Sequence, residues 1–144
     1  MDYTTKRQEY IENRDAKFAS YNSDRLTRSI SAHRGKLTNQ GKLIAQLITI
    51  SAATPSKRTS QELERLKRDI DDKCADIEAG YEILLSRAVA NSDAEREIQK
   101  SLDAALAAHA TMSRDTMAAL AIAPAATLQA VSYTHLTLPT ILRV

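Results

Sequence analysis

The chain has 144 residues and a formal net charge of +2, from 20 basic and 18 acidic side chains. Three glycines, one phenylalanine and no tryptophan argue against a β-sheet protein, whereas the frequent Ala, Leu, Lys, Arg and Glu favour helices. The single cysteine excludes an internal disulfide, and neither a signal peptide nor an apolar run long enough for a membrane span is recognisable. We therefore expect an all-α intracellular protein, cytoplasmic in location, with no membrane partner.

The charges are unevenly distributed along the chain. Residues 1–60 hold eleven basic and five acidic side chains, whereas residues 61–130 hold eight and thirteen. Such complementary halves are typical of two helices that pair with each other, or of a basic arm that binds nucleic acid or an anionic membrane. We favour pairing within the protein.

The first predicted elements are an arm and a helix. Residues 1–21 carry a weak helical pattern with aromatic apolar positions, and we expect a weakly helical N-terminal arm. From residue 22 the large side chains alternate steps of four and three, which predicts a helix over about 22–52. Gly35 and Gly41 lie within it, and each costs about 1 kcal/mol relative to alanine. We expect a bend or a close helix contact there.

A second helix is predicted after a break at Pro55, because proline lacks an amide donor and disfavours helix in the residue before it. Thr59 and Glu62 then have the spacing of a capping box, in which a hydroxyl and a carboxylate satisfy the first free amides of a helix. The pattern predicts a helix over about 60–90, with charged residues on the faces away from its apolar stripe.

A third helix is predicted over about 93–122. Ser92 and Glu95 repeat the capping-box spacing, and the apolar stripe continues until Pro124. The second half of this helix is rich in alanine, which favours helix but buries little surface. We assign residues 22–123 to one helical bundle.

The predicted packing interface lies on the first two helices, where large apolar side chains face one another. Two helices alone bury too little surface to offset the entropy of ordering them, so a third helix or a second copy must cover these seams. We expect an all-α fold, either a long antiparallel helical hairpin or a three-helix bundle with coiled-coil-like packing. The predicted interface residues are Leu26, Ile30, Leu37, Ile44, Leu47, Leu63, Leu66, Ile70, Ile77, Tyr81 and Leu84.

No catalytic or metal site is predicted. His33, Cys74 and His109 occur one per predicted helix and lack the spacing of metal ligands. The acidic residues of the second helix lack the glycine and the register of a calcium loop, so we expect a solvated face; they are Asp69, Asp71, Asp72, Asp76 and Glu78. Residues 1–130 contain none of the common catalytic motifs. We expect a non-enzymatic protein with no cofactor and no small-molecule substrate.

The first predicted helix also carries a row of basic side chains, Arg25, Arg28, Arg34, Lys36 and Lys42. Helical spacing can place several of them beside a phosphate backbone, as in a nucleic-acid contact. The alternative, which we favour, is that they pair with the acidic second helix. The partners that we expect are a second copy of the chain or a partner helix.

One segment resembles a known family. Residues 33–38 (HRGKLT), a helix that continues to residue 50, a break, and residues 62–66 (ELERL) leading to residues 81–82 (YE) resemble the helical region that opens BEL/Pao-type retrotransposon gag-like polyproteins. The resemblance covers about residues 25–90 and implies a self-assembling structural region of a longer polyprotein, with nucleic-acid contact. The alternative is a coiled-coil interaction domain of a cytoskeletal or trafficking scaffold that binds a partner helix.

The last residues resemble a translated sequencing adaptor. Residues 131–140 read VSYTHLTLPT, which is the translation of a transposase mosaic end and its primer site in one frame. We interpret residues 131–144 as an adaptor-derived artefact that forms a disordered tail, and residues 124–130 as a truncated linker. Downstream protein sequence is then expected to be missing.

Overall fold

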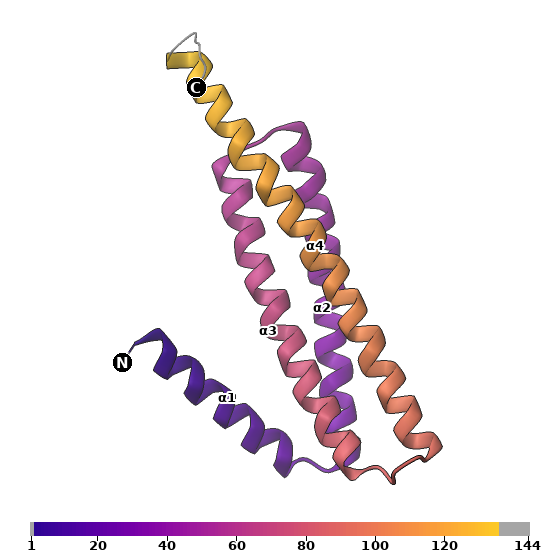
Figure 1. The fold of residues 1–144 in the computed structure, drawn as a ribbon. Coiled ribbons are helices and arrows are strands. Elements are labelled where there is room, and N and C mark those ends of the chain that lie inside the picture. The colour runs from indigo at the N-terminus through magenta and orange to yellow at the C-terminus, as the bar shows by residue number, and fades with distance from the viewer. Residues whose placement is uncertain (1, 136–144) are drawn as a thin grey trace. The chain divides into compact units, whose positions relative to one another are not determined.

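The fold is all-α, as the sequence predicts. The computed structural model describes residues 2–135, and the side chains of residues 2–121. Its described part contains four helices and no strand: α1 (Tyr3–Ser20), α2 (Ser23–Ala53), α3 (Lys57–Arg87) and α4 (Asp93–His135) (Figure 1). None of these helices combines the length and apolarity that a membrane crossing requires. Residues 136–144 of the predicted disordered tail lie outside the described residues.

The N-terminal arm is a continuous helix of 18 residues. The side chain of Asp2 caps its start, since Asp2 Oδ1 accepts a hydrogen bond of 2.8 Å from the Thr5 amide. Asn22 caps α2 in the same way, accepting from the Arg25 amide at 2.8 Å. Short polar side chains therefore cap the starts of both α1 and α2.

The start of α3 differs from the sequence prediction. The capping residue is Ser56, whose Oγ accepts from the Thr59 amide at 3.1 Å, so α3 begins at Lys57 and Thr59 lies in its first turn. The predicted cap at Thr59 is therefore wrong. Ser56 offers the same hydroxyl three residues earlier, directly after Pro55, where the helix becomes possible.

The start of α4 agrees with its predicted capping box. Ser92 Oγ accepts from the Glu95 amide at 3.1 Å, and the Glu95 carboxylate accepts from the Asn91 amide at 3.0 Å. Asn91 has a φ of 62°, in the left-handed region that asparagine tolerates better than most residues. The connection between α3 and α4 therefore turns at Asn91.

The end of α4 lies beyond the predicted position. The helix continues through Pro124 to His135, although the sequence predicts an end at residue 122 and a linker over 124–130. Proline removes one helical hydrogen bond and crowds the preceding turn. The alanines on both sides have the highest helix propensity of all residues, which offsets this cost in the backbone described here.

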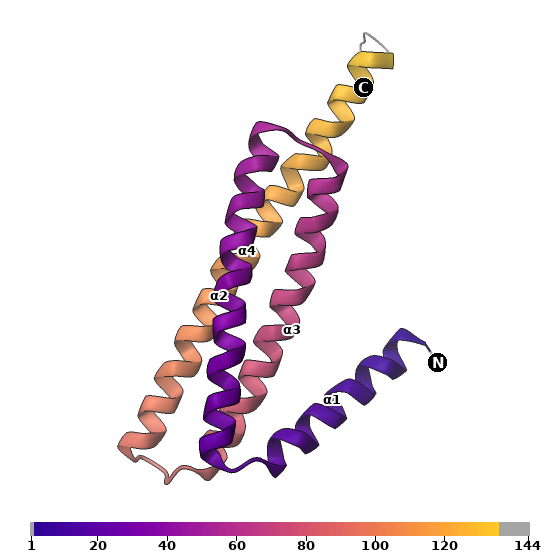
Figure 2. The same ribbon diagram turned by 180° about the vertical axis from the view of Figure 1, so that it is seen from behind.

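The helices form two packing units. Unit 1 contains the described residues up to 38 and residues 72–109, and unit 2 contains residues 39–71 and the described residues from 110 onward. Each of α2, α3 and α4 contributes a segment to both units, whereas α1 belongs to unit 1 alone. The connection between α2 and α3 belongs to unit 2 (Figure 2).

Unit 1 has a core formed by all four helices. Gly80 of α3 permits a close approach to α2, because a Cβ at this position would lie 2.7 Å from Cγ1 of Ile30. The second half of α3 therefore packs directly on the first half of α2. The buried apolar residues of this core are Phe18, Leu26, Ile30, Leu37, Cys74, Ile77, Tyr81, Leu84, Leu102 and Ala105.

Unit 2 has a smaller core of three helical segments. Gly41 of α2 faces α4, since a Cβ there would lie 2.6 Å from the sulfur of Met112. Thr116 of α4 is fully buried and donates to the Met112 carbonyl at 2.7 Å, which satisfies its hydroxyl. The other buried residues are Ile44, Ser51, Ser60, Leu63, Leu66 and Ile70.

Candidate functional site

The predicted packing interface is the protein's own core. Ten of its eleven residues are buried, and Leu47 is partly exposed. In each unit a segment of α4 completes the core, through Leu102 and Ala105 in unit 1 and Thr116 in unit 2. The three-helix alternative is therefore confirmed in unit 2, and in unit 1 segments of the same three helices pack together with α1. A second copy of the chain is not needed to cover these residues.

Two of the predicted basic residues contact aromatic rings rather than acids. Arg34 Nη1 donates to the Tyr81 hydroxyl of α3 at 3.0 Å. The Arg25 guanidinium lies 4.1 Å from the centroid of the Tyr21 ring, in a cation–π arrangement. Both residues thus stabilise unit 1 internally.

The other three basic residues, Arg28, Lys36 and Lys42, are exposed and form no ion pair with any residue that the structure describes. The prediction that the basic residues of this helix form ion pairs with the acidic helix is therefore wrong, although Arg34 does contact that helix through Tyr81. Apart from pairs within α3, the arginines that pair with acids of α3 come from α1, where Arg7 binds Asp72 at 2.8 Å. The sequence signal for α1 is weak because its apolar face is aromatic and its other faces are charged.

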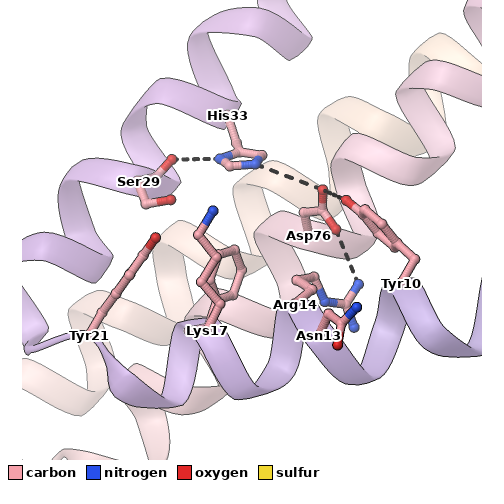
Figure 3. A pocket seen from close by; sticks show the side chains of 9 residues that line it. Tyr10, Asn13, Arg14, Lys17, Tyr21, Ser29, His33 and Asp76 are labelled. Carbon is pink, nitrogen blue, oxygen red and sulfur yellow. Dashed lines mark hydrogen bonds and ion pairs between the residues drawn. The ribbon is translucent and has the colours of Figure 1, made fainter.

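A buried carboxylate, Asp76 of α3, is the centre of the α1 contact. Only 6% of its side chain is exposed, so the prediction of a solvated acidic face is wrong at this position. Asp76 Oδ2 accepts a hydrogen bond of 2.8 Å from the Tyr10 hydroxyl, and Oδ1 accepts from Arg14 Nη1 at 3.2 Å (Figure 3). Its charge is thereby compensated by two donors from one helix.

Helical spacing explains how these groups meet. Arg7, Tyr10 and Arg14 occur at i, i+3 and i+7 and therefore lie on one face of α1. Asp72 and Asp76 occur at i and i+4 on α3 and present their carboxylates to that face. This double spacing is visible in the sequence, but the sequence does not show which helix faces which.

The electrostatics of the cluster follow from this geometry. Burial, the hydrogen bond to Asp76 and the negative charge of that carboxylate raise the pKa of Tyr10 to about 12. Partial burial lowers the pKa of Arg14, but hydrogen bonds to Asp15 and Asp76 outweigh burial and leave it raised. At neutral pH the cluster therefore contains a neutral phenol and a charged guanidinium around Asp76.

His33 of α2 completes the cluster. Its Nδ1 lies 2.7 Å from the Ser29 carbonyl, and because a carbonyl oxygen only accepts, Nδ1 carries the proton. Its Nε2 lies 3.8 Å from Asp76 Oδ2. The cluster thus joins α1, α2 and α3, and the role that its geometry supports is to hold α1 in place.

A cavity of about 290 Å³ adjoins the cluster. Nine residues line it, and five of them belong to α1. Among the described residues, no group of three or more His, Cys, Asp and Glu side chains is placed to hold a metal ion. The aromatic and charged side chains that line the cavity are of the kind that contact organic ligands.

An exposed apolar stripe lies on α2 in unit 2. Leu43 is 49% exposed and Ile50 is 51% exposed, and Leu47 between them is partly exposed. Their spacing of i, i+4 and i+7 places the three side chains on one face of the helix. These three residues are named the α2 stripe below.

Residues 33–38, which carry part of the gag-like resemblance, lie in the interior of α2, ten residues after its start. Comparisons of the chain with protein-family models, curated proteins and solved structures find no match.

Proposed function

We propose that this chain is a non-enzymatic helical interaction region that self-associates through the α2 stripe. The observation that carries the proposal is the half-exposed row of Leu43, Leu47 and Ile50 on one helix face. Burying apolar surface is favourable by about 25 cal/mol per Å². The stripe is thus a surface that gains free energy when another apolar surface covers it.

A second copy of α2 is a suitable cover. In an antiparallel crossing about a two-fold axis, Leu47 meets its own equivalent, and Leu43 meets Ile50 of the other copy. Three side chains per copy form a small interface, well below the roughly 800 Å² per partner of stable complexes. We therefore expect a weak dimer that forms in a concentration-dependent way.

Sedimentation equilibrium over a wide concentration range tests this proposal. The double substitution Leu43→Glu, Ile50→Glu is expected to abolish the dimer, because it places like charges where the apolar faces meet. The double substitution Ala45→Glu, Ala52→Glu is a matched control, since it adds the same charge at two exposed positions of α2 with the same spacing. Helicity measured by circular dichroism should be unchanged in both variants. A monomer at every concentration, or a dimer that tolerates the double substitution, would contradict the proposal.

The same proposal has a more specific form, in which the region belongs to a BEL/Pao-type gag-like polyprotein. Residues 33–38 and 62–66 support this form through their resemblance to that family, and self-assembly is what the resemblance implies. Sequencing independent transcripts across codon 130 tests it. A zinc knuckle or an aspartic-protease motif downstream would support the polyprotein, whereas further heptads would support an interaction scaffold.

A further inference from the structure

The cavity beside Asp76 has the features of a ligand site that the self-association proposal does not use. It is lined by α1, by Tyr21, by the turn of α2 that carries Ser29 and His33, and by Asp76 of α3, all within unit 1, and it is open to solvent on one side. Its volume of about 290 Å³ is close to the lower limit of small-ligand pockets, roughly 300 Å³. It can accommodate one aromatic ring with a small substituent.

One wall of the cavity is aromatic. The Phe18 ring lies edge-on to the His33 ring at 6.2 Å and is tilted against the Tyr21 ring at 6.1 Å. Phe18 is buried, and the Arg25 guanidinium lies 4.1 Å from the centroid of the Tyr21 ring. Such a wall favours a flat apolar ligand, because aromatic rings pack edge-to-face or offset against one another.

The charged residues that line the cavity, Arg14, Lys17 and Asp76, favour an anion, and Lys17 is exposed to solvent at its edge. Asp76 is compensated by Tyr10 and Arg14, whereas the Lys17 ammonium forms no hydrogen bond or ion pair with any described residue. Figure 3 shows the Lys17 side chain pointing from α1 toward the segment of α2 that carries His33. One uncompensated cation therefore lies beside the aromatic wall.

We propose that this cavity binds a small aromatic carboxylate, with its ring against Phe18 and Tyr21 and its carboxylate on the Lys17 ammonium. A carboxylate accepts charge-assisted hydrogen bonds from an ammonium group, and the ring fills the space between α1 and α2. Because five of the nine lining residues belong to α1, the bound ligand stabilises the docking of that helix.

The test is a titration of the full chain with benzoate, followed by amide chemical shifts in NMR spectra. Saturable shifts are expected near Lys17, Tyr21 and His33. Benzamide, which has the same shape without the charge, is expected to bind about two- to fivefold more weakly, the range of one exposed ion pair. The measurement is made at a protein concentration where sedimentation shows a monomer, so self-association does not affect the result.

Three variants distinguish a specific site from general attraction to a cation. Lys17→Met should weaken benzoate binding by the same about two- to fivefold factor, and Lys17→Arg should restore it. Lys6→Met is the control, because Lys6 is an exposed lysine of α1 that does not line the cavity. Absence of saturable shifts, equal binding of benzamide, or an equal effect of the Lys6 and Lys17 substitutions would overturn the proposal.

Discussion

At the scale of single residues, the buried carboxylate of Asp76 places a strict requirement on its neighbours. A carboxylate with 6% of its side chain exposed requires hydrogen-bond donors, because a buried unpaired charge is strongly destabilising. Tyr10 and Arg14 supply those donors from α1. Asp76 therefore holds α1 in unit 1 together with the Arg7–Asp72 pair and the buried Phe18.

Replacing the carboxylate should expose this dependence. We expect Asp76→Ala to lower the free energy of unfolding by about 2–3 kcal/mol, because it leaves the partly buried Arg14 paired only with Asp15 and removes the acceptor of the Tyr10 hydroxyl. Urea denaturation followed by circular dichroism measures the change. Asp69→Ala is the control, since Asp69 pairs with Arg65 at the surface of the same helix and should cost at most about 0.5 kcal/mol. Equal effects of the two substitutions would mean that the buried cluster does not stabilise the fold.

The raised pKa of Tyr10 makes a prediction about alkaline pH. The pKa of Tyr10 is about 12 in the folded state, above the ordinary value of 10.0. The Tyr10 hydroxyl therefore loses its proton at a lower pH in the unfolded chain than in the folded protein. The contribution of Tyr10 to stability is complete below pH 10 and is lost as the pH rises through 12. Denaturation at a series of pH values should show this loss of stability. In Tyr10→Phe, the part of the loss that comes from ionisation of Tyr10 should be absent. An identical pH dependence in both proteins would contradict the assigned environment.

At the scale of helices, periodicity predicts most of what is observed. The apolar periodicity of the α2 and α3 sequences identifies ten residues of the core. This works because each helix is longer than 30 residues and repeats the pattern many times. The sequence does not identify the contact of α1, since its key pairs join residues 62 to 66 positions apart. Long-range pairing depends on which helix faces which, and no local pattern contains that information.

Substitutions at two glycines distinguish the effect of helix propensity on stability from the effect of helix packing. A Cβ at Gly35 meets no atom within 4 Å, so Gly35→Ala should raise the free energy of unfolding by about 0.5–1 kcal/mol through propensity alone. A Cβ at Gly80 would clash with Ile30, so Gly80→Ala should lower it by about 1–2 kcal/mol. Thermal denaturation of the two variants compares these effects. Stabilisation by both would mean that α2 and α3 do not approach closely at Gly80.

At the scale of the whole molecule, the buried apolar residues and the exposed apolar residues have different roles. The apolar stripes that the sequence assigns to an interface are buried inside the two units. The self-association that we propose therefore uses exposed residues, and the α2 stripe is an exposed apolar row that shares only Leu47 with the predicted interface. In the proposed dimer, folding and association use different faces of α2, so substitutions at Leu43 and Ile50 are expected to alter association without altering the fold.

The adaptor interpretation makes a prediction about the complete chain. A segment translated from adaptor sequence has no selected packing, and the last turns of a helix contribute little to global stability. A chain shortened to end at Ala130 should therefore match the full chain in assembly state and, within about 2 °C, in melting temperature. Calorimetry and sedimentation measure the two properties. A clear loss of stability would mean that residues after 130 pack against the fold, and the same tail in independent transcripts would assign them to the natural protein.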